Sequence, residues 1–167
     1  MTFYAVTTII FFIVAVPSSI YDIKKMRIPL YYVLAGFFIM AGFYVYYFKF
    51  KIPPFFVNCI AGSFLSALLM IAARFITEGG LGWGDVIFSA FAGLYLSIPY
   101  CFIAAGISAL CGLIFYLLTS GIKKRFSEKG TLIKVRFSLP YIPFITAGTF
   151  LTVLVLFLKK KKKIIIA

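Results

Sequence analysis

Long apolar runs separated by short polar segments dominate this chain. Charged residues or prolines bound the runs, which cover residues 3–21, 28–48, 55–73, 86–119 and 139–158. A helix needs about 20 apolar residues to cross a bilayer, and the first three runs and the last are of that length. The pattern therefore predicts membrane-spanning helices over these runs.

The run over residues 86–119 is too long for one crossing. As a single helix it would extend roughly 50 Å, at about 1.5 Å per residue, against a hydrocarbon core of about 30 Å. We expect it to fold back near Ser97, Ile98 and Pro99. The sequence thus predicts an all-α, polytopic integral membrane protein with about six transmembrane helices, forming one domain over residues 1–158. Residues 159–167 form a lysine-rich C-terminal tail.

Composition and charge agree with a membrane protein. Hydrophobic residues make up 63% of the chain and charged residues 13%, while the formal net charge is +13. In a soluble domain such a charge would suggest nucleic acid as a partner. The basic residues cluster between apolar runs, which is typical of loops beside anionic lipid headgroups. We therefore expect membrane lipids as partners and no nucleic acid.

Six crossings place the segments after crossings one, three and five on the same face of the membrane. Most basic residues fall there, and the positive-inside rule makes this face cytoplasmic, in the inner (cytoplasmic) membrane. They are Lys24, Lys25, Arg27, Arg74, Lys123, Lys124, Arg125, Lys129, Lys134 and Arg136, against Lys49 and Lys51 opposite. The lysines at 159–163 would fall on the outer face. Either this tail is translocated or the last helix does not fully cross, and the sequence leaves both open.

The chain has only four acidic residues, Asp22, Glu78, Asp85 and Glu128. Asp22 directly follows the first apolar run, and Asp85 follows a glycine-rich turn directly before the fourth. Because an ionisable residue at membrane depth costs about 2.5–3.5 kcal/mol even on the lenient insertion scale, such residues are functional-site candidates. Both aspartates lie at the same membrane face, so we expect them to form a pair. Glu78 and Glu128 lie in polar segments and are interpreted as solvated charges.

Two carboxylates that share a site cannot both ionise comfortably, so one serves as a base and the other as an acid. Water between them can attack a peptide carbonyl without a metal or cofactor. The absence of histidine excludes Ser-His and Cys-His catalysis and any His-ligated metal. Gly82 and Gly84 permit φ values closed to other residues and let the backbone approach a substrate closely.

Each of these residues also has a structural interpretation. Asp22 could be neutralised by Lys25 or Arg27, one turn away. The glycines could form a tight turn or a helix contact. Arg74 and the basic cluster at 123–136 are most simply determinants of topology, and Trp83 is an interfacial aromatic residue.

Three segments resemble the type IV prepilin peptidases, which are membrane aspartic proteases with a Gly-x-Gly-Asp motif. They are Asp22-Ile23-Lys24-Lys25-Met26-Arg27-Ile28-Pro29, Gly82-Trp83-Gly84-Asp85-Val86, and Leu139-Pro140-Tyr141-Ile142-Pro143-Phe144 with Gly148. The resemblance implies a cytoplasm-facing catalytic pair, Asp22 and Asp85, supported by Gly82, Gly84, Pro29 and Pro143. It also implies cleavage of the basic leader from prepilin, pseudopilin or preflagellin-like precursors.

The chain departs from the family's pattern at two positions. Leu30 stands where asparagine is common, and Ile87 stands where lysine is common. Only six residues separate Asp22 from Pro29, with no cysteine among them, so the zinc domain and N-methyltransferase activity of larger family members are not expected. The competing hypothesis is a non-catalytic six-helix protein such as a small transporter or pilus-assembly scaffold. Transporter sites tend to lie near the midplane, whereas both aspartates lie at one membrane edge.

Overall fold

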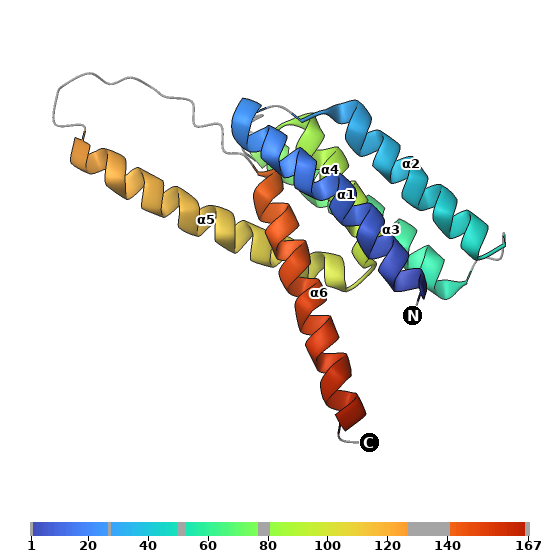
Figure 1. Ribbon diagram of the computed structural model, residues 1–167. Coiled ribbons are helices and arrows are strands. Elements are labelled where there is room, and N and C mark those ends of the chain that lie inside the picture. The colour runs from blue at the N-terminus through green and yellow to red at the C-terminus, as the bar shows by residue number, and fades with distance from the viewer. Residues whose placement is uncertain (1, 27, 50–52, 77–80, 127–140, 166–167) are drawn as a thin grey trace.

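The computed structural model describes residues 2–26, 28–49, 53–76, 81–126 and 141–165, and every structural statement below concerns these residues. They form helices joined by short connections, without a strand in the described ranges. The helices are α1 (Thr2–Lys25), α2 (Leu30–Tyr47), α3 (Pro54–Ile76), α4 (Trp83–Leu96), α5 (Tyr100–Phe126) and α6 (Ile142–Ile165). The all-α prediction is confirmed, and each expected crossing corresponds to one helix (Figure 1).

The helices differ in how fully they could cross a bilayer. Helices α1, α2 and α3 are long and apolar enough to do so, whereas the apolar stretches Trp83–Leu96, Tyr100–Phe115 and Ile142–Leu158 are shorter. The 14 residues of α4 extend about 21 Å, at about 1.5 Å per residue, which is less than a hydrocarbon core of about 30 Å. The predicted break near Ser97 is confirmed, because that residue ends α4 with a positive φ of 60°. The chain is a polytopic membrane protein, and its described residues contain three apolar helices of membrane length and three shorter apolar stretches, in α4, α5 and α6.

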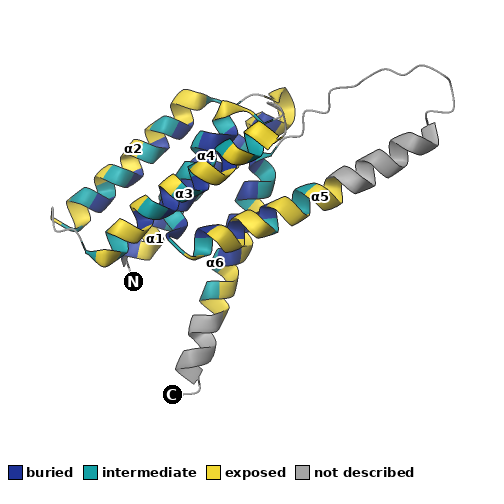
Figure 2. Cartoon of the chain, turned by 180° about the vertical axis from the view of Figure 1, so that it is seen from behind, coloured by how far each residue is buried: buried dark blue, intermediate teal, exposed yellow. Residues whose placement is uncertain are grey.

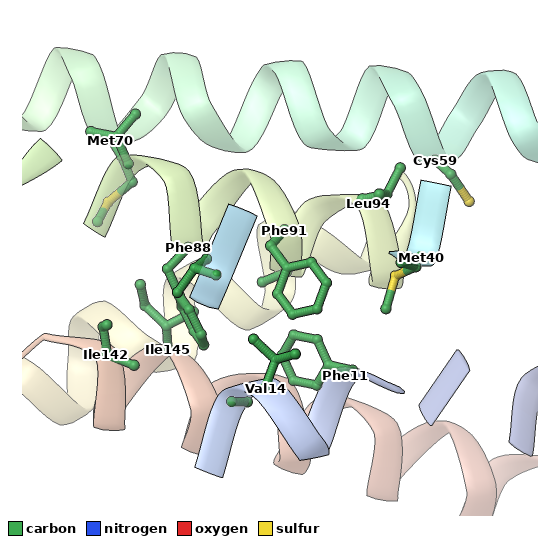
Figure 3. Close-up of a cluster of buried hydrophobic side chains, with 14 of the residues drawn as sticks. Phe11, Val14, Met40, Cys59, Met70, Phe88, Phe91, Leu94, Ile142 and Ile145 are labelled. Carbon is green, nitrogen blue, oxygen red and sulfur yellow. The ribbon is translucent and has the colours of Figure 1, made fainter. Parts of the chain in front are cut away.

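A core of large apolar side chains joins α1, α2, α3, α4 and the start of α6 (Figure 3). Within it the rings of Phe11 and Phe91 stack with centroids 5.2 Å apart. The outward faces of the same helices are exposed (Figure 2). Exposed apolar side chains on these helices include Phe38 and Leu68. Exposed apolar surface on this scale marks contact with membrane, so these faces are suited to lipid.

Small residues set the closest helix contacts. Helices α3 and α4 share the most extensive interface, followed by α5 and α6. A Cβ added to Gly62 would lie 2.8 Å from the carbonyl oxygen of Gly93, and one added to Gly148 would lie 2.6 Å from that of Ala104. Such close approach is typical of membrane helix pairs, whose interfaces favour small residues. The α3–α4 and α5–α6 contacts therefore help to set the positions of α4 and α6 beside α1.

One end of the molecule collects the segments that carry the predicted motifs. Figure 1 shows the C-terminal end of α1 and the N-terminal ends of α4 and α6 at this end. Helix α6 runs away from it and continues through residues 159–163 to Ile165, so most of the predicted tail has helical backbone.

Candidate active site at the ends of α1, α4 and α6

Asp22 lies in the last turns of α1 and points into the protein. Only 5% of its surface is exposed, whereas its neighbours Tyr21 and Ile23 are exposed. Its Oδ2 accepts a hydrogen bond of 3.3 Å from the backbone N–H of Ile142, the first residue of α6. A carboxylate at this position is stabilised by the positive end of the α6 dipole. Asp22 therefore connects α1 to the start of α6.

Asp85 lies in the first turn of α4 and is also buried, with 7% of its surface exposed. Its Oδ2 accepts a hydrogen bond of 2.9 Å from the N–H of Gly82, which immediately precedes the helix. The N–H of Asp85 in turn donates to the carbonyl oxygen of Gly82, at 3.2 Å. An acidic side chain that reaches back in this way caps the start of a helix and fixes its own orientation. Each aspartate is thus held at a helix N-terminus by a backbone N–H.

The two carboxylates lie close enough to interact electrostatically. Ile28, shortly after α1, packs against Gly84 in the first turn of α4, which brings the two motif segments together. The catalytic pairing of Asp22 and Asp85 stays a prediction. Asp85 Oδ1 is buried and, among the described residues, has no hydrogen-bond partner. Buried polar atoms in folded proteins are nearly always hydrogen-bonded, so an orphaned carboxylate oxygen here suits a group that binds during function.

The glycines before Asp85 act differently from the prediction. Gly82 has an extended backbone, with φ −77° and ψ 154°, which any residue adopts, and Gly84 belongs to the first turn of α4, not to the turn before it. Position 84 has no room for a larger side chain, because Ile28 packs against it. An added Cβ would lie 2.7 Å from the Cβ of Ile28. The φ values closed to other residues that these glycines permit are therefore not used here. The close approach that Gly84 permits is to another part of this chain.

Both motif prolines precede or begin a helix. The carbonyl oxygen of Pro29 accepts the N–H groups of Tyr32 and Val33 and so starts α2. Pro143 lies in the first turn of α6, where a missing N–H costs no helical hydrogen bond. The adjacent N–H of Ile142 remains directed at Asp22. Their role is to fix helix starts beside the aspartates.

The alternative that Lys25 neutralises Asp22 is not favoured by the position of the Lys25 side chain. The Nζ atom of Lys25 lies over the ring of Tyr21, 4.9 Å from its centroid. Arg27, the other proposed partner, lies outside the described residues, as do Glu78, Glu128 and the basic residues at 127–138. Ile87, at the position where lysine is common in the family, packs against the apolar core.

Two residues near the pair were not recognised as site residues from the sequence. The guanidinium of Arg74 lies over the ring of Trp83 and is close enough to Asp85 to act on its charge. Tyr141, directly before α6, also interacts electrostatically with Asp85. Arg74 lies on a different helix from Asp85, and its position at a helix end indicated only topology. Tyr141 belongs to the third segment that resembles the family, but no role was assigned to it there.

The arrangement can perform acid–base chemistry. It combines two buried carboxylates that interact, each held by one backbone N–H, with an aromatic hydroxyl and a guanidinium nearby. Within the ranges that the structure describes, no three His, Cys, Asp or Glu side chains gather as a metal site would require.

Comparison with known proteins identifies the family. No curated protein and no solved structure matches the chain. The family model described as the type IV leader peptidase family matches residues 9–117, which is more than half of the 167 residues. The matched span contains Asp22 and Asp85 together with Arg74, Gly82 and Gly84. The chain therefore belongs to the type IV leader peptidase family.

Proposed function

We propose that this protein is an aspartic endopeptidase that removes the basic leader peptide from type IV prepilin-like precursors, whether prepilins, pseudopilins or preflagellin-like proteins. The observation that carries the proposal is the meeting of Asp22 and Asp85, from separate helices, as a buried carboxylate pair. Membership of a leader peptidase family supplies the substrate class. Burial of both acids near one another suits peptide hydrolysis better than a solvated surface role.

In the proposed mechanism, a water molecule lies between the two carboxyl groups. The ionised aspartate takes a proton from this water while the neutral one donates a proton to the carbonyl oxygen of the scissile peptide bond. The new C–O bond gives a tetrahedral intermediate, and the C–N bond then breaks as a proton passes to the leaving nitrogen. The unpartnered Oδ1 of Asp85 is suited to contact the water or the substrate carbonyl.

The backbone hydrogen bonds leave one oxygen of each carboxylate for this chemistry. Gly82 N–H and Ile142 N–H each hold an Oδ2 atom, and Asp85 Oδ1, which has no hydrogen-bond partner among the described residues, is suited to exchange protons. Holding both groups on helix termini limits their motion, and pre-positioning of reacting groups is a major source of rate enhancement. No metal and no cofactor takes part in this scheme, and we propose peptidase activity without N-methylation.

The proposed location is the cytoplasmic face of the inner membrane. Asp22 and Asp85 lie at ends of helices and not near their middles, which suits a bond cut at the membrane surface. Lys24 and Lys25 lie in the last turn of α1 beside the pair, where they are suited to anionic headgroups. The leader of a precursor would then be cut where it leaves the membrane.

The test is incubation of the purified protein in detergent with a prepilin-like precursor that has a basic leader. Mass spectrometry of the products identifies the bond that is cut. We expect one cleavage, between the leader and the apolar segment that follows it. A soluble unrelated peptide of equal length serves as the control and should stay intact. Cleavage of neither substrate, or equal cleavage of both, would contradict the proposal.

A further inference from the structure

Arg74, in the last turn of α3, makes two contacts with the segment that leads to Asp85. Its Nη1 atom donates a hydrogen bond to the carbonyl oxygen of Leu81. Its guanidinium carbon lies 4.9 Å from the centre of the Trp83 ring, as in a cation–π contact. One side chain thus contacts the residues on both sides of Gly82.

These contacts bear on Asp85 through a single peptide unit. The carbonyl group of Leu81 and the N–H group of Gly82 belong to the same planar peptide, in which the two groups point in opposite directions. Arg74 holds the carbonyl end, and the N–H end donates to Asp85 Oδ2 at 2.9 Å. A donor at the carbonyl also polarises the peptide and strengthens the hydrogen bond that its N–H makes.

We propose that Arg74 is a positioning residue that orients Asp85 through the peptide unit between Leu81 and Gly82. The effect on catalysis rests on the proposed function, whereas the contact itself does not. Because Arg74 belongs to α3, the proposal gives the tight α3 and α4 pair a role in the site. The close approach of Gly62 to Gly93 holds those helices together, and Arg74 contacts Leu81 and Trp83 at the start of α4.

The geometry requires arginine and not merely a positive charge. A guanidinium is planar, carries several donors, and can hydrogen-bond at its edge while it lies flat on an aromatic ring. A lysine could donate to the Leu81 carbonyl but could not also cover the Trp83 ring in the same way. The charge of Arg74 also acts on Asp85, and among the described residues two other ionisable groups do so as well. The others are Asp22 on α1 and Tyr141 before α6.

Trp83 offers a direct readout, since it is the only tryptophan in the chain and 62% of its surface is exposed. The intrinsic fluorescence of the protein therefore reports on the ring that Arg74 covers. The test compares Arg74→Met and Arg74→Lys with the wild type in detergent, using acrylamide quenching of this fluorescence together with kcat and KM for precursor cleavage. Lys49→Met is the matched control. It removes an exposed positive charge beyond the far end of α2.

We expect stronger quenching of Trp83 in Arg74→Met and intermediate quenching in Arg74→Lys, with no change in Lys49→Met. We also expect Arg74→Met to lower kcat by about 10²-fold, the scale for a catalytic group misplaced by about 1 Å, with KM nearly unchanged. Arg74→Lys should restore part of kcat. A purely structural role would not give a loss confined to kcat that lysine partly reverses.

Other outcomes overturn the proposal. Unchanged quenching in Arg74→Met refutes the contact, whether or not the wild type cleaves any precursor. A rise in KM with constant kcat shows that Arg74 binds substrate instead. If Arg74→Met does not fold, Arg74→Lys decides alone, and wild-type quenching with wild-type kcat in that variant refutes the proposal. A wild type that cleaves nothing refutes the proposed function, and the quenching result still decides on the contact.

Discussion

The side chain of Ile28 lies directly against the backbone of Gly84. A Cβ added to Gly84 would come within 2.7 Å of the Cβ of Ile28. This contact joins the segment after Asp22 to the first turn of α4, which carries Asp85. Two motifs separated by more than fifty residues of chain therefore meet through an isoleucine and a glycine as well as through their aspartates.

Gly84→Ala should displace the first turn of α4 and separate the carboxylates. Because Ile28 leaves no room for a methyl group, we expect cleavage of a prepilin-like precursor to fall by about 10²-fold, the scale for a misplacement of about 1 Å. The same substitution combined with Ile28→Ala should recover much of the activity, since the smaller side chain makes room. The rate of precursor cleavage measures both effects.

Gly42→Ala is the matched control, because a Cβ at Gly42 meets no atom within 4 Å. It should keep wild-type activity. Equal activity of Gly84→Ala and Gly42→Ala would refute the role of the Ile28 contact.

Gly93→Ala should destabilise the protein by separating α3 from α4. The added Cβ would lie 2.8 Å from the backbone carbon of Gly62, which cannot move without shifting a helix. Overpacking of this kind costs about 1–3 kcal/mol, so we expect a lower Tm in detergent. Gly106→Ala, with open space around the glycine, should leave Tm unchanged. A Gly93→Ala protein as stable as Gly106→Ala would contradict the proposed packing.

Much of the fold was accessible from the sequence because lipid imposes a simple rule on long apolar runs. The six helices and the break near Ser97 follow from run length and from the thickness of the hydrocarbon core. The start of α4 was less accessible. The apolar run was expected to begin at residue 86, whereas the helix begins at Trp83.

The two candidate acids could be singled out from the sequence, but the contacts that hold them could not. Scarcity of acidic residues singled out Asp22 and Asp85, and counting the crossings placed them at one membrane face. The N–H groups that hold them, from Ile142 and Gly82, are backbone atoms that no residue type indicates. The sequence also did not show why glycine is needed at position 84, because the side chain of Ile28 reaches it only in the folded protein.

Cysteine accessibility tests the orientation in the membrane. In a protein lacking Cys59, Cys101 and Cys111, single cysteines at Lys25 and Gly80 should be labelled by an impermeant maleimide only from the cytoplasmic face. A cysteine at Lys51 should be labelled only from the other face, because one more crossing separates it from Lys25. Labelling of the Lys25 and Gly80 positions from opposite faces would contradict a shared site for the aspartates.

Chelators and pH distinguish a carboxylate pair from a metal-dependent enzyme. A pair of aspartates needs no cation, so EDTA and phenanthroline should leave precursor cleavage intact. Activity should depend on pH as a bell-shaped curve, with two apparent pKa values that belong to Asp22 and Asp85 as a unit. Loss of activity with chelator and its recovery with zinc or magnesium would assign the aspartates as metal ligands instead.

The most direct test of the account is the cleavage rate of Asp22→Asn and Asp85→Asn. An amide keeps the shape of the side chain but cannot exchange the proton that the mechanism requires. We predict that each variant is inserted, folded and inactive, while Glu128→Gln, a matched change in an acid outside the family match, cleaves at the wild-type rate. Wild-type cleavage by either aspartate variant would show that Asp22 and Asp85 are not the catalytic pair.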